Sequence, residues 1–168
     1  EAHDDVINSN SKIQNPFPTV LEYLKDRLEL PSEKVAAFAC WDVMDYIAEK
    51  EKGSIVSNSG FEEYDHQYPF IQLLSRQQFE TPTPWDSVRH DTYTFRFAMA
   101  HLETHRPRVL YLSLGETDDW AHDKRYDRVL QATHQNDRYF RELWNWLQSQ
   151  EDYRDQTIIL FATDHGRG

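Results

Sequence analysis

The chain has one cysteine, Cys40, among its 168 residues. A lone cysteine excludes an internal disulfide and every metal site that needs several cysteines. Glycine is also scarce, with 5 residues against a usual share of about 7%. No stretch approaches the roughly 18 consecutive apolar residues of a membrane-spanning helix, so we expect no membrane span.

Basic residues are few as well. Lys and Arg number 18, Asp and Glu number 29, and the formal net charge is −11. A chain this acidic lacks the positive surface that attracts phosphate backbones, so nucleic acid is not expected as its main partner. Aromatic residues make up 14% of the sequence. Their large buried area favours a packed core over disorder, and the length favours one domain.

Apolar runs and helical spacing alternate along the chain. Continuous apolar runs are typical of strands buried in a sheet, whereas apolar residues three and four apart predict helices. We expect strands at residues 35–41, 55–56, 109–114 and 157–162. We expect helices that begin near Pro18, Asp42, Pro69, Asp86 and Asp123.

The last third of the chain predicts the fold class. A buried strand at 109–114, a long helix over about 123–150 and a second buried strand at 157–162 form a crossover unit, which joins parallel strands. The recurring alternation therefore predicts an α/β domain with a mainly parallel sheet and helices on both faces. Residues 1–168 are expected to be one domain that is incomplete, because the sequence stops directly after an apolar strand.

Acidic and imidazole side chains follow both late strands. Asp118 and His122 come after the first, and Asp164 and His165 come directly after the second. In open parallel sheets, ligands bind beyond the carboxyl ends of the strands. Carboxylate oxygen and imidazole nitrogen bind zinc, and four such side chains suffice for one site or half the shell of a two-metal site. Bound cations would let an acidic chain hold an anionic substrate.

The same residue types elsewhere in the chain are expected to be structural or solvent-exposed. Asp86 and His90 share the spacing of four but follow no buried strand, so we interpret Asp86 as a helix cap. His101 and His105 are expected on a solvated helix face. Capping of a following helix is also the alternative for the carboxylates after the two late strands.

One motif makes the comparison specific. The run Gly115-Glu116-Thr117-Asp118-Asp119-Trp120-Ala121-His122, a long helix, and an apolar strand into Thr163-Asp164-His165-Gly166 resemble the alkaline phosphatase superfamily. That superfamily includes nucleotide pyrophosphatases/phosphodiesterases, cofactor-independent phosphoglycerate mutases and sulfatases. The likeness is greatest to the type I phosphodiesterase/nucleotide pyrophosphatase branch, and it covers roughly residues 107–168.

The resemblance implies two divalent metal ions, zinc being the first expectation and manganese the second. By the same resemblance Asp118 and His122 bind one ion, and Asp164 and His165 bind the other. The implied activity is hydrolysis of a small-molecule phosphoester. Many relatives are exported, so a periplasmic or secreted location is expected from the resemblance alone.

The family also needs a Thr or Ser nucleophile near the end of its first strand. Thr117 and Thr163 do not occupy that position, so no catalytic residue is assigned and the chain is expected to be inactive alone. A sulfatase, a phosphoglycerate mutase and a non-catalytic metal-binding relative remain alternatives. The irregular stretch 58–91 is interpreted as a specificity insertion, and Trp120 is a candidate to line the substrate pocket.

Overall fold

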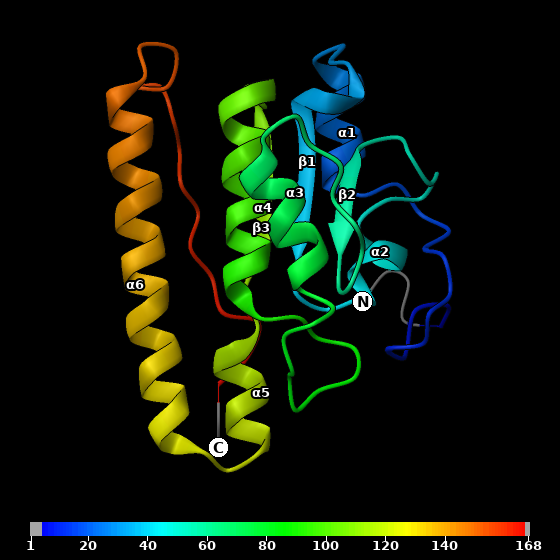
Figure 1. The fold of residues 1–168 in the computed structure, drawn as a ribbon. Coiled ribbons are helices and arrows are strands. Elements are labelled where there is room, and N and C mark those ends of the chain that lie inside the picture. Colours follow the sequence, from blue (N-terminus) through cyan, green and yellow to red (C-terminus); the bar gives the residue numbers. More distant parts are fainter. Residues whose placement is uncertain (1–4, 167–168) are drawn as a thin grey trace.

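The computed structural model describes residues 5–166 and has a parallel sheet flanked by helices (Figure 1). Within those residues the sheet has three strands in the order β2-β1-β3, and both pairings are parallel. The elements in chain order are α1 (Val20–Arg27), the 3₁₀ turn η1 (Ser32–Lys34), β1 (Val35–Ala39), α2 (Met44–Ile47), β2 (Val56–Ser59), α3 (Pro69–Gln77), α4 (Asp91–His105), β3 (Val109–Ser113), α5 (Glu116–His122) and α6 (Tyr126–Ser149). The α/β class with a parallel sheet is therefore confirmed.

The central strand β1 is buried along its whole length. Its neighbours are β2, where Ala36 pairs with Val56, and β3, where Val35 pairs with Val109. Alternate β1 side chains enter two different clusters: Phe38 packs with Phe97 of α4, whereas Ala37 packs with residues of α1. Helices therefore cover both faces of this strand, which explains why its sequence is continuously apolar.

The strand β3 is only half buried, although its apolar run predicts a strand buried on both faces. Leu110 and Leu112 pack towards α4, but Tyr111 between them is 41% exposed. The physical reason is position, because β3 is an edge strand within the described chain and its second face has less cover.

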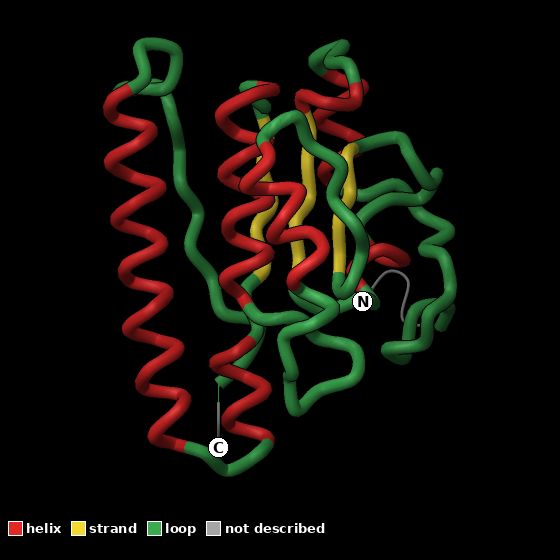
Figure 2. Tube along the Cα trace, in the orientation of Figure 1, coloured by secondary structure: helices red, strands yellow, loops and turns green. Residues whose placement is uncertain are grey.

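The predicted strand at 157–162 is wrong for this structure. The segment runs as an unpaired chain from the end of α6 back towards α5, as Figures 1 and 2 show. Ile159 packs against the apolar cluster beside β3, but Ile158, Leu160 and Phe161 are 87%, 91% and 80% exposed. An apolar run favours an extended, buried conformation, but it does not by itself supply the strand that must pair with it.

The long helix α6 lies against α4. The rings of Tyr139 on α6 and Phe95 on α4 stack with their centroids 4.2 Å apart, and Leu147 is buried in the same cluster. Phe140 and Trp144, on the same helix, remain exposed. Among residues 5–166 no helix is both long enough and apolar enough to cross a membrane.

Two predicted helix caps are wrong. Helix α2 is preceded by Val43 without a side-chain cap, and Asp42 instead forms an ion pair of 2.6 Å with Lys12. Helix α4 begins at Asp91, so Asp86 lies in the loop before it. In contrast, α1 has a complete capping box of Thr19 and Glu22, two residues that the sequence prediction did not use.

His101 is the clearest correction among the histidines. It is 2% exposed, where a solvated face was predicted, while His105 one turn later is exposed. The Nε2 atom of His101 lies 3.0 Å from the carbonyl oxygen of Glu33, and Nδ1 lies 3.3 Å from the Tyr64 hydroxyl. Burial, with smaller contributions from nearby cationic groups, lowers the pKa of His101 to about 4.

His101→Gln should therefore change how stability depends on pH. Folding favours the neutral imidazole, so its contribution is present above the ordinary pKa of 6.5 and is lost as the pH falls towards about 4. The original chain should lose about 2–3 kcal/mol of unfolding free energy between pH 7 and 4 that the variant keeps. Urea unfolding at a series of pH values measures this difference.

The matched control is His134→Gln, which removes an exposed histidine of α6. This variant should lose stability at acid pH just as the original chain does. Parallel pH profiles for His101→Gln and the original chain would contradict the assignment.

Candidate metal centre

The carboxyl ends of β1 and β3 meet at one edge of the sheet, and α5 begins there (Figure 1). Gly115 joins β3 to α5 and lies directly against the end of β1. A Cβ atom at this position would approach the Cys40 Sγ atom to 2.6 Å and the Asp119 Oδ2 atom to 3.2 Å. The absence of a side chain at Gly115 therefore lets the first turn of α5 sit close to the sheet.

The four predicted metal ligands lie near one another. The Nε2 atom of His122 is 3.3 Å from Asp118 Oδ2, one turn earlier on α5. From the C-terminal segment, the Nε2 atom of His165 lies 3.7 Å from Asp118 Oδ1 and 3.6 Å from Asp164 Oδ2. The structure thus brings the end of the 157–162 segment to the helix that follows β3.

The chemistry of this donor set fits a divalent cation such as zinc. In a tetrahedral site with bonds of about 2.0–2.1 Å, neighbouring donor atoms are about 3.3–3.4 Å apart. The separations around Asp118 are equal to that value or somewhat longer. Asp118 is half buried, and the other three are exposed. Within residues 5–166 no three such side chains are already arranged to hold a metal ion.

A buried acidic cluster lies beside the same turn, and the sequence prediction missed it. Asp91, the first residue of α4, accepts hydrogen bonds from the backbone N–H groups of Gly115 at 2.8 Å and Glu116 at 3.2 Å. In return, Glu116 Oε1 accepts one from the backbone N–H of Asp91 at 2.9 Å. These reciprocal bonds tie the start of α5 to the start of α4. Acidic residues at helix starts are common, so neither residue carried a signal.

The electrostatics of the cluster separate its carboxyl groups. Burial, and then the nearby charge of Glu116, raises the pKa of Asp91 to about 7. Burial also acts to raise the pKa of Glu116, but its hydrogen bonds with His90 and the Asp91 N–H outweigh it and leave the pKa lowered. The hydrogen bond with Glu116 raises the pKa of His90. Burial, and then the charge of Asp118, raises the pKa of Asp119 to about 6.

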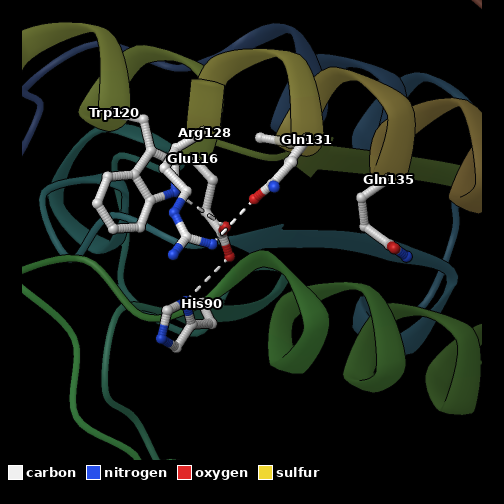
Figure 3. Close-up of a pocket in the computed structure, with 7 residues that line it drawn as sticks. His90, Glu116, Trp120, Arg128, Gln131 and Gln135 are labelled. Carbon is white, nitrogen blue, oxygen red and sulfur yellow. Dashed lines mark hydrogen bonds and ion pairs between the residues drawn. The ribbon is translucent and has the colours of Figure 1, made fainter. Parts of the chain in front are cut away.

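A small pocket of about 270 Å³ lies between α5 and α6 (Figure 3). It is lined by His90, Glu116, Trp120, Arg128, Gln131, Ala132 and Gln135. In an α-helix, residues two apart point in nearly opposite directions. The face of α5 that lines this pocket is therefore opposite the face that carries Asp118 and His122. Trp120 does line a pocket, but one that faces away from the predicted metal ligands.

The loop between α3 and α4 packs on α5. The rings of Trp85 and Trp120 meet edge to face with centroids 4.6 Å apart, and the Trp85 Nε1–H donates to Asp123 Oδ2 at 3.1 Å. Residues 58–91 also include the end of β2 and all of α3, whose Ile71 belongs to the core. The role of this stretch in specificity stays a prediction.

No protein-family model matches the chain. Searches among curated proteins and among solved structures found no significant match either. The resemblance to the alkaline phosphatase superfamily is therefore carried by the motif residues alone.

Asp91→Asn should remove a pH-dependent contribution to stability. Folding favours the protonated Asp91 carboxyl, so its contribution is present below the ordinary pKa of 3.8 and is lost as the pH rises towards about 7. Between pH 4 and 7 the original chain should lose about 2–4 kcal/mol of unfolding free energy relative to the variant. Urea unfolding at several pH values checks it, with exposed Asp152→Asn as the control. A constant difference between the two chains would contradict the assignment.

Gly115→Ala should destabilise the chain by about 1–3 kcal/mol, because the new methyl group overlaps the Cys40 sulfur. Cys40→Ala removes that sulfur. The double variant should therefore be more stable than the sum of the two single changes predicts, as measured by urea unfolding. Additivity within about 0.5 kcal/mol would show that the contact does not limit this position.

Proposed function

We propose that this chain is part of the catalytic domain of a metal-dependent hydrolase of small-molecule phosphoesters, similar to the alkaline phosphatase superfamily. The observation that carries the proposal is the approach of His165 to Asp118, two residues from motifs far apart in the sequence, to 3.7 Å. The motif comparison depends on such a meeting at the sheet edge. A mainly parallel sheet is the coarser feature that the proposal also needs.

In this proposal Asp118 and His122 hold one divalent ion, and Asp164 and His165 hold the other. Bound zinc or manganese would supply Lewis acidity towards phosphoryl oxygens and a water molecule of lowered pKa. Asp118 lies between the two imidazoles, so its carboxylate keeps both near the sheet edge. The bonds between the first turns of α4 and α5 hold that edge in place. No residue is proposed as the nucleophile.

Metal binding tests the proposal directly. Titration of the metal-free chain with Zn²⁺ or Mn²⁺, followed by calorimetry, should show binding that weakens at least tenfold in Asp118→Asn and in His165→Gln. Each change removes a donor that the proposal assigns to an ion, and the expected loss is that of a lost ligand. Equal affinity in the original chain and both variants would refute the ligand assignment.

The controls are Asp152→Asn and His134→Gln, which remove an exposed carboxylate and an exposed imidazole elsewhere. Both should bind metal as the original chain does. For the reaction itself, the intact protein should be assayed on phosphomonoesters, phosphodiesters and sulfate esters with its metal content determined. Turnover of a phosphoester that falls by orders of magnitude in Asp118→Ala supports a hydrolase. Metal binding without turnover of any ester would indicate a non-catalytic relative.

A further inference from the structure

Residues 157–162 have the composition of a sheet strand without its hydrogen bonds. The exposed side chains of Ile158, Leu160 and Phe161 are apolar, and Ile159 between them is packed inwards. In the described part of the chain no backbone hydrogen bond joins residues 157–163 to another segment. A backbone in this condition can pair with any open sheet edge within reach.

The nearest open edge is that of β3. Within residues 5–166, β3 pairs only with β1, which leaves its other edge without a ladder. Ile159 already packs in the cluster that contains Leu110 and Leu112 of β3. In Figure 1 the segment runs between α6 and the helix α4 that covers β3.

The two ends of the segment are already aligned with the two ends of β3. Just before the segment, the Tyr153 hydroxyl donates to the carbonyl oxygen of Pro107 at 2.8 Å, two residues before β3 begins. Just after it, His165 approaches Asp118, on the helix that follows β3. The segment is therefore parallel to β3 and matched to it start to start and end to end. Six residues also match the five of β3 in length.

The contact at the far end is weak in the absence of a cation. The His165 imidazole and the Asp118 carboxylate are 3.7 Å apart, and both lie partly in solvent. Exposed pairs of this kind contribute little to stability. A cation that takes ligands from both sides would replace this contact with coordinate bonds and hold the end of the segment beside the end of β3.

We propose that residues 157–162 form a strap that docks on the open edge of β3 as a fourth parallel strand when a divalent cation joins Asp164 and His165 to Asp118 and His122. The inference rests on the proposed function, because it uses the same four ligands. Docking and cation binding then stabilise each other, so a change that blocks one must weaken the other by the same factor.

Amide hydrogen exchange of the chain with and without Zn²⁺ tests the strap. Zinc should slow exchange at residues 158–162 and at β3 at least tenfold, and a chelator should reverse the effect. Exchange in β1 should change little, because both its edges are already paired. His165→Gln should abolish the protection together with the zinc affinity.

Leu160→Pro separates the strap from the metal site, since proline removes an N–H from the segment and leaves all four ligands in place. This variant should show no zinc-induced protection, and its zinc affinity should fall about tenfold. The control Ala162→Ser keeps the backbone N–H and should behave as the original chain.

Three results would overturn the strap. Zinc binding that requires Asp118 and His165 but leaves exchange at 158–162 unchanged rejects the strap and leaves the proposed function standing. Full protection without zinc rejects the coupling, because the strand then docks by itself. Absence of zinc binding removes both the proposed function and the strap.

Discussion

The parallel pairing of β1 with β3 is the constraint on which the rest of the structure depends. It places Val35 beside Val109 and Ala39 beside Ser113, so both strands end at the same edge of the sheet. Whatever follows one strand must therefore lie near whatever follows the other. The contact of Gly115 with Cys40 makes this meeting close, because no side chain separates the start of α5 from the end of β1.

The helix α5 has different chemistry on its two sides. One side presents Asp118 and His122 to the C-terminal segment, and the other presents Glu116 and Trp120 to the pocket against α6. The reciprocal hydrogen bonds with Asp91 hold the helix between them. A buried carboxyl with a raised pKa is the electrostatic consequence of packing two acidic helix starts together in the interior.

Several elements could be predicted because their signals are local. Continuous burial explains why the apolar run of β1 predicts a strand, and Pro69 does open a helix at the position expected from its fixed φ angle. The half-buried β3 and the unpaired 157–162 run show where such signals fail, since the same apolar composition does not specify neighbours. His101 was misassigned for the related reason that its burial depends on the strand and loop that pack against α4.

The sequence by itself determined the α/β class, the long helix α6, and the identity of the acid–imidazole pairs that follow the two late apolar runs, because these depend on residue type and spacing along the chain. Only the tertiary structure decided that Asp91 and Glu116 share a buried cluster, that Trp120 faces away from Asp118, and that His165 reaches Asp118. Those relations join residues far apart in the sequence or on different faces of one helix. Packing and backbone pairing set them, and neither is encoded in any local pattern.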